Sequence, residues 1–179
     1  MNAGRCNRGY TRLMTVDDSR RPGRWVLLCY RMPREPSTPR IAVWRKLKRL
    51  GVGQLVDGLV ALPADARTQE QLEWIAQEIT ESGGEASIWL ARPGSLHNEA
   101  QITARMTQAR NGEYRDVIVA AEEAVGASER DRRRAVDRLN AELRRIGRRD
   151  FFPTAERDLA HAAVRSLLST SPSGEVIAR

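Results

Sequence analysis

Cationic side chains gather in two segments of this sequence. The first segment holds five of them and no acidic residue: Arg40, Arg45, Lys46, Lys48 and Arg49. The second is rich in arginine: Arg130, Arg133, Arg134, Arg138, Arg144, Arg145, Arg148 and Arg149. A guanidinium group meets phosphate oxygens, or O6 and N7 of guanine, with two hydrogen bonds at once, whereas an ammonium group is a point charge. Both segments therefore predict contact with a polyanion, and we expect double-stranded DNA as the partner.

A smaller group of residues is suited to binding a tetrahedral oxyanion. Two arginines and two hydroxyls lie within eight positions: Arg31, Arg34, Ser37 and Thr38. If a helix begins here, its free backbone N–H groups also favour an anion. The alternative is structural, with the arginines paired to Glu35 and nearby acids and the hydroxyls serving only as helix caps.

The first cationic segment is predicted to lie on an amphipathic helix. Residues 26–30 are an apolar run of strand length, and Thr38-Pro39 is typical of an N-cap followed by proline at the first helical position. On a helical wheel the apolar side chains share one side and the cations the other. The alternative interpretation is a solvated basic face on a core helix.

The next elements predict an α+β fold. Residues 54–56 and 59–62 flank Asp57-Gly58, a dipeptide favoured in tight hairpin turns. Thr68 and Gln71 form a candidate capping box for a helix that ends at Gly83-Gly84, and a strand follows at 86–91. The order strand, helix, hairpin, helix, strand predicts a ferredoxin-like sheet with both helices on one face, followed by a C-terminal helical region.

The last third of the sequence is predicted to be helical. One helix is expected from Leu96 to about Val125, with a possible break at Asn111-Gly112. Ser128 is expected to cap the arginine-rich helix, which would end near Ile146. This helix contacts phosphates or a DNA groove in one interpretation, and in the other it is a solvated face partly paired with its own acids. Phe151 and Phe152 are expected to anchor a final helix capped by Thr154.

The expected division of the whole chain is a flexible basic arm (1–23), a ferredoxin-like domain (24–93), a helical region (94–168) and a disordered tail (169–179).

The sequence also resembles a known family, the N-terminal part of ChrB-type chromate-resistance regulators. The match covers roughly 24–168 and is densest at Trp25, Tyr30, Arg31, 33–37, Arg40, Trp44, Arg45 and Leu47, and it continues at 58–63, 71–74, 83–85, 113–115 and 148–152. The resemblance implies a regulator of a chromate-efflux operon that binds promoter DNA and is released by chromate. Longer members carry a second, C-terminal domain associated with sensing, so we expect a separate protein to supply that role here.

The predicted body also looks like those of PaaX-type regulators and of small CRISPR adaptation nucleases. Those nucleases place a metal-binding aspartate at the end of the first strand, where this sequence has Tyr30, Arg31 or Met32. A cation there would repel Mg²⁺, so we do not expect cleavage by that route. Asp57, Asp65 and Glu85 offer the only alternative route to a nuclease.

Composition narrows the remaining classes. The formal charge of +7 favours polyanionic partners, and no apolar run is long enough to span a membrane. Cys6 and Cys29 are expected to be free thiols in a cytoplasmic protein. His97 and His161 are isolated, and no catalytic motif, metal site or cofactor site is predicted.

Two function classes follow from these observations. The first is a DNA-binding transcriptional regulator, expected to be a homodimer paired through a sheet face or edge. The second is a non-catalytic accessory protein whose ferredoxin-like body assembles with other proteins.

Overall fold

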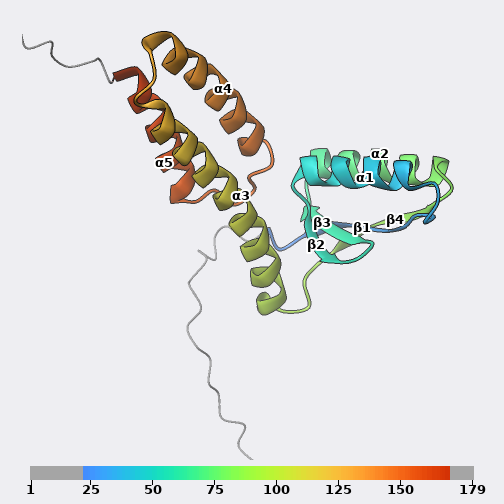
Figure 1. The fold of residues 1–179 in the computed structure, drawn as a ribbon. Coiled ribbons are helices and arrows are strands. Elements are labelled where there is room, and N and C mark those ends of the chain that lie inside the picture. Colours follow the sequence, from blue (N-terminus) through green and yellow to red (C-terminus); the bar gives the residue numbers. More distant parts are fainter. Residues whose placement is uncertain (1–21, 170–179) are drawn as a thin grey trace, which may run out of the picture.

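A four-stranded antiparallel sheet with two helices on one face is joined to a group of three further helices (Figure 1). The structure is a computed structural model, and it describes residues 22–169. Most of the expected basic arm, Cys6 and nearly all of the expected tail lie outside these residues. The elements are β1 (Trp25–Arg31), α1 (Ser37–Leu50), β2 (Gly53–Val56), β3 (Leu59–Pro63), α2 (Ala66–Glu81), β4 (Glu85–Ala91), α3 (Leu96–Ala124), α4 (Glu129–Gly147) and α5 (Ala155–Ser169).

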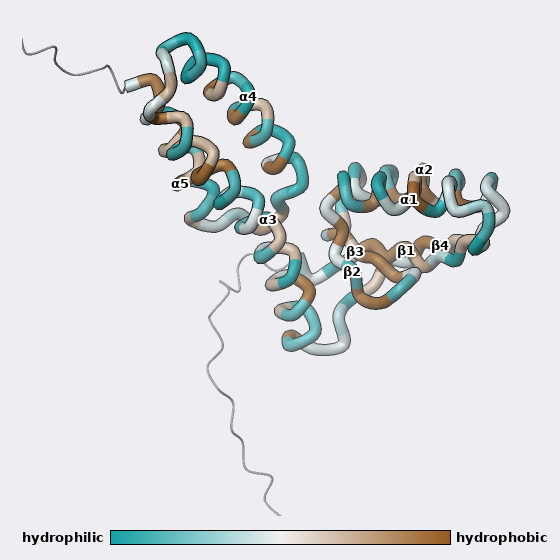
Figure 2. Tube along the Cα trace, in the orientation of Figure 1, coloured by the Kyte–Doolittle hydropathy of each residue, from teal (hydrophilic) through white to brown (hydrophobic). Residues whose placement is uncertain are grey.

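The strands lie in the order β2-β3-β1-β4, and every neighbouring pair is antiparallel. This order fits the ferredoxin-like arrangement predicted from the sequence, and the α+β class is confirmed. Along β1 the side chains of Val26 and Leu28 are fully buried, and in register they lie opposite Leu62 and Val60 of β3. Because side chains alternate between the faces of a strand, these four residues form one face of the sheet. That face packs against the apolar sides of α1 and α2 (Figure 2).

The hairpin between β2 and β3 forms at the predicted dipeptide. Gly58 has a φ of 75°, a left-handed conformation that glycine adopts without steric cost. Its carbonyl accepts a hydrogen bond of 2.7 Å from the backbone N–H of Tyr30, so the turn is tied to β1. A side chain at this position would also collide with the Tyr30 carbonyl, because a Cβ built there lies 2.4 Å from that oxygen.

Two predicted helix starts are wrong. Helix α1 begins at Ser37, with Pro36 as an N-cap that makes no side-chain hydrogen bond, so Thr38 lies inside the first turn. Helix α2 begins at Ala66 and its N-cap is Asp65, not Thr68. The Asp65 carboxylate accepts from the Thr68 backbone N–H at 2.7 Å, and the Thr68 hydroxyl accepts from the Asp65 backbone N–H at 3.0 Å. This pair is a capping box one turn earlier than the predicted one, because an aspartate caps as well as a threonine does.

Helix α3 runs without a break and belongs to two cores. Ile102 and Met106 in its first half pack against the sheet, beside Gly53 of β2. Tyr114 and Val117 in its second half pack with α4 and α5. One continuous helix therefore contributes to the core of the sheet with its first half and to the core of the helical region with its second half.

Phe152 lies in the sheet core rather than in the core of the last helix. Its ring centroid is 6.2 Å from that of Trp25, and 7 % of the residue is exposed. The loop between α4 and α5 is thereby fixed to the sheet. No helix within residues 22–169 has both the length and the apolar character that crossing a membrane requires.

Candidate nucleic-acid interface

The C-terminal ends of α1 and α4 meet at the boundary between the sheet and the helical region. Just after α4, Nη1 of Arg149 lies 3.5 Å from the carbonyl oxygen of Lys48, near the end of α1. The first turn of α2 joins them, because Nη1 of Arg67 lies 3.5 Å from the carbonyl oxygen of Arg148. We call the exposed side chains of Lys48, Arg49, Arg67 and Arg148 the basic junction.

Gly51 allows this approach. It ends α1 in a left-handed conformation with a φ of 74°, and its N–H caps the last carbonyls of the helix. A Cβ at this position would lie 2.8 Å from the Cβ of Arg149, closer than two carbon atoms can approach. The glycine therefore ends the helix and admits the chain from α4.

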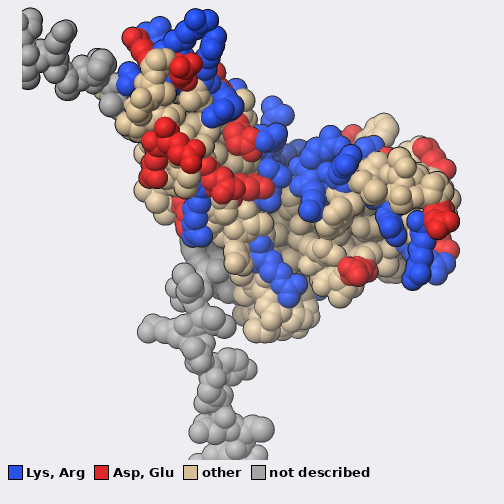
Figure 3. All heavy atoms as spheres, in the orientation of Figure 1, with Lys and Arg blue, Asp and Glu red and all other residues tan. Residues whose placement is uncertain are grey.

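The cations of the basic junction have no acidic partner. Within residues 22–169, no carboxylate lies within ion-pair distance of Lys48, Arg49, Arg67 or Arg148. Lys48 Nζ lies 5.4 Å from the ring centroid of Trp44, and the Arg67 guanidinium 5.9 Å from that of Phe151. These contacts with aromatic rings leave most N–H donors free. Figure 3 shows basic side chains gathered over α1 and continuing toward the nearby end of α4.

A mostly buried ion network lies between α3 and the end of α4, next to the basic junction. Oε1 of Glu113 lies 3.2 Å from the guanidinium groups of both Arg110 and Arg149. The Tyr114 hydroxyl donates a hydrogen bond of 2.9 Å to Asp150. Burial lowers the pKa of Arg110 while Glu113 opposes this effect, and burial raises the pKa of Tyr114. The network holds the chain at 148–150 against α3.

The other predicted DNA-binding residues divide into paired and unpaired cations. Four form exposed or half-exposed ion pairs: Lys46 with Glu78, Arg133 with Glu129, Arg134 with Asp131, and Arg145 with Glu142. Five have no carboxylate partner among the described residues: Arg40, Arg45, Arg130, Arg138 and Arg144. Because an α-helix rises 1.5 Å per residue, Arg130 lies about 25 Å along α4 from the basic junction. The structure thus brings α1 together with the end of α4 and leaves the start of α4 apart.

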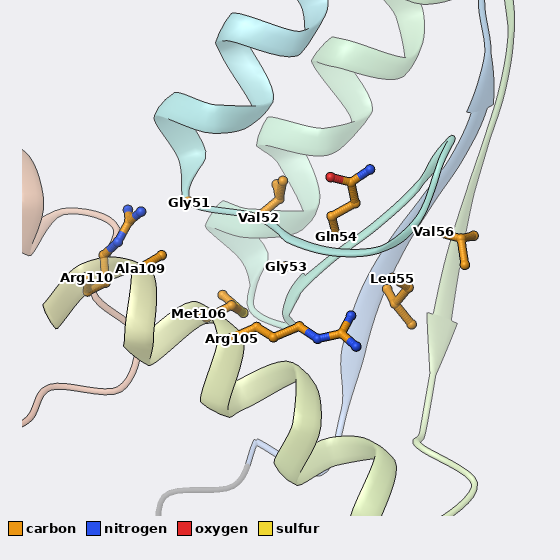
Figure 4. A pocket seen from close by; sticks show the side chains of 10 residues that line it. All are labelled: Gly51, Val52, Gly53, Gln54, Leu55, Val56, Arg105, Met106, Ala109 and Arg110. Carbon is orange, nitrogen blue, oxygen red and sulfur yellow. The ribbon is translucent and has the colours of Figure 1, made fainter. Parts of the chain in front are cut away.

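Sequence reasoning missed three arginines at this place. Arg67 and Arg110 reach the basic junction from α2 and α3. Arg105 lies one turn before Arg110 and extends beside β2 toward Leu55 (Figure 4). It helps to line a cavity of about 390 Å³ between β2 and α3, which continues from Gly51 at the basic junction. Nothing in the local sequence distinguishes these arginines from other helical ones.

The predicted oxyanion residues do not share a cavity. Arg31 forms an exposed ion pair with Glu85 at 3.2 Å, and Ser37 and Thr38 lie in the first turn of α1. Arg31 lines a cavity of about 520 Å³ whose other lining residues are Tyr30, Met32, Arg40, Ile41, Trp44, Gln54, Asp57 and Gly58. Neither Arg34 nor the two hydroxyls line it. Of the cationic residues near this turn, Arg31 and Arg40 are the two that line this cavity.

The acidic residues named for a metal route lie in separate places. Gln54 donates a hydrogen bond of 3.1 Å to Asp57 in the hairpin, Asp65 caps α2, and Glu85 pairs with Arg31. The described part of the chain holds no group of three or more His, Cys, Asp or Glu residues that could bind a metal ion. Cys29 is an exposed free thiol on β1.

Two comparisons bear on the family. A family model described as "Protein ChrB, N-terminal" matches residues 40–130, which is about half of the chain. The chain is also 28 % identical over 140 residues to a curated protein of Cupriavidus metallidurans named "Protein ChrB". That match covers 72 % of this chain and 40 % of the relative, so the similarity extends over less than half of the relative's length.

Proposed function

The chain belongs to the family of ChrB N-terminal domains, and from this premise we propose that it is a DNA-binding transcriptional regulator related to the regulators of chromate-resistance operons. The basic junction is the observation that carries the proposal. Lys48 and Arg49 come from one helix, Arg67 from a second, and Arg148 from the end of a third. All are exposed, and none has an acidic partner among residues 22–169.

Rigid elements position these cations. The ion network around Glu113 fixes the end of α4, and Phe152 fixes the following loop to the sheet. Charges held in one place lose little conformational entropy when they contact phosphates, and each neutralised phosphate releases counterions. Arg45 lies one turn before Arg49 on α1, and Arg105 lines the cavity that reaches Gly51, so both add positive charge near the basic junction.

The proposal also covers the cellular location and the oligomeric state of the protein. We propose that the protein acts in the cytoplasm as a homodimer.

Footprinting on the DNA upstream of the protein's own gene, with and without chromate, tests the proposal directly. We expect a protected site whose affinity exceeds that for random DNA by about 10³ or more. In a salt titration, log K should fall against log salt with a slope of about −0.9 for each phosphate neutralised. Weak binding that is equal for all sequences would contradict the proposal.

A second candidate function is that of an accessory protein acting through protein contacts. It is favoured by large apolar side chains on the surface, such as Trp74, Trp89 and Leu90, which are 67 %, 61 % and 53 % exposed. Such a protein would bind DNA without sequence preference, so the same footprinting separates the two functions.

A further inference from the structure

The two edges of the sheet are built differently. Strand β2 is short, its pairing with β3 shifts register between Gln54 and Val56, and α3 lies beside it. Strand β4 is a regular strand of seven residues that pairs with β1 along its whole length. Among the described elements it contacts mainly β1 and α2, so its outer edge has no strand beside it (Figure 1).

Strand β4 also lacks the features that keep an edge strand from pairing. Bulges, lysines, prolines and inward charges are the usual protection, and Glu85–Ala91 contains none of the first three. Its only charge, Glu85, is at its first residue. Trp89 and Leu90 are exposed on opposite faces of the strand, which is largely apolar in its second half (Figure 2). An open strand of this composition is a template for another strand.

We propose that β4 pairs antiparallel with β4 of a second copy of this chain, centred on Ile88, so that one sheet runs through both subunits. This register places Ile88 opposite its own equivalent and uses every residue of the strand. Residues that lie opposite each other share a face of the sheet, so α1 and α2 of both subunits lie on the same side.

The side chains fit this register in size. On the face away from the helices, Ser87 lies opposite Trp89 of the partner subunit. On the helix face, Ala86 lies opposite Leu90 of the partner subunit. Each large exposed side chain thus meets a small one, which is the arrangement that lets cross-strand neighbours pack.

Charge also selects a second copy in the antiparallel direction. Glu85 begins the strand and Arg92 follows its last residue, so in the centred register Glu85 lies opposite Ala91 of the partner subunit, one position from Arg92 of the partner subunit, at both ends. Parallel pairing would bring like charges together. A shift of two residues in one direction would bring Pro93, which has no N–H, into the ladder, and a shift in the other direction would bring in Gly83 and Gly84. The centred register is therefore preferred.

This inference specifies the homodimer of the proposed function, and its test is made without DNA, so its failure leaves DNA binding to be judged separately. The oligomeric state of the full chain is measured by light scattering after gel filtration over a range of micromolar concentrations. We expect a dimer for the natural sequence and a monomer for Trp89→Lys and for Leu90→Lys. Both side chains are exposed in the single chain, so these variants should fold.

Trp74→Lys is the matched control, because Trp74 is as exposed as Trp89 but lies on α2. It should remain a dimer. A natural chain that is monomeric at every concentration overturns the proposal, and so does a dimer that persists in both β4 variants.

Cysteine cross-linking tests the register in a background with Cys6→Ser and Cys29→Ser. Facing Cα atoms in an antiparallel pair are about 4.5–5.5 Å apart, a distance that a disulfide can span. Ile88→Cys should therefore form a cross-linked dimer under mild oxidation. Ser87→Cys should not, because two Ser87 residues are offset by two positions along the strands. The reverse result overturns the proposed pairing.

Discussion

Arg149 and Glu113 join the end of α4 to α3 through an ion pair of 3.2 Å, with 15 % and 28 % of their side chains exposed. The same carboxylate oxygen lies 3.2 Å from Arg110, whose side chain is 12 % exposed. One carboxylate thus serves two largely buried guanidinium groups. The position of the basic junction depends on it, because Arg148 is the residue before Arg149.

Replacing Glu113 by Gln should destabilise the fold strongly. The variant leaves two largely buried guanidinium groups without their shared carboxylate, and losing one member of a buried ion pair typically costs about 3–5 kcal/mol. The free energy of unfolding in urea measures the effect. Glu142→Gln is the control, because its partner Arg145 is 70 % exposed, and an exposed pair is worth about 1 kcal/mol or less. Equal losses in the two variants would contradict the structural role of Glu113.

Replacing Gly53 by Val should loosen the contact between β2 and α3. A Cβ at Gly53 would lie 2.7 Å from Ile102 and 3.0 Å from the sulfur of Met106, so α3 must move away. Overpacking of this kind costs about 1–3 kcal/mol. Thermal unfolding measures the loss. Gly94→Val, at a site with no atom near the new Cβ, should unfold at nearly the natural temperature.

Stability should fall at alkaline pH because of Tyr114. Burial, followed by the hydrogen bond to Asp150, raises the pKa of its hydroxyl above the value in the unfolded chain. The unfolded chain then loses this proton above about pH 10 while the folded chain keeps it, so the stabilisation is complete below that pH and is lost above it. The slope should approach about 1.4 kcal/mol per pH unit for one such group.

Urea titrations at a series of pH values around 10 measure this slope. Tyr114→Phe should flatten the decline, although it lowers stability at neutral pH by leaving Asp150 without its donor. Tyr30→Phe should remove a smaller part, because the pKa of Tyr30 is also raised by burial and by Asp57. An unchanged slope in Tyr114→Phe would show that other groups cause the decline.

The order of elements could be predicted because each signal is local. Asp57-Gly58 marks the hairpin, Gly51 and Gly83 end helices, and apolar periodicity identifies what lies between them. The start of α2 could not be predicted, because Asp65 and Thr68 are three residues apart and both are good capping residues. The local pattern permits either, and in the structure both take part, Asp65 as the N-cap and Thr68 as its partner in the capping box.

The candidate site was predictable only in part, for a different reason. Lys48, Arg49 and Arg148 stand out in the sequence because they lie in runs of cations. Arg67 and Arg110 do not, and their places depend on contacts between residues far apart in the chain, such as Arg67 with Arg148. Ion pairing also changes the prediction. Arg133 pairs with Glu129 at the i,i+4 spacing that the sequence already indicates, whereas Lys46 pairs with Glu78 of α2, which sequence spacing does not assign.

DNA binding should depend on the basic junction more than on the first half of α4. In Lys48→Gln with Arg148→Gln, two exposed cations without acidic partners are lost from one place, so the slope of log K against log salt should become less steep by about 1.8 if both contact phosphates. Arg134→Ala with Arg138→Ala removes the same charge from a more distant surface, where Arg134 already pairs with Asp131 at 3.8 Å, and should have a smaller effect.

Arg115→Gln with Arg165→Gln, on α3 and α5, is the charge-matched control and should leave the slope close to the natural one. Fluorescence anisotropy with labelled operator DNA at several salt concentrations gives all three slopes. If the three double variants weaken binding equally, net charge alone accounts for the affinity, and the basic junction is not the surface that meets DNA.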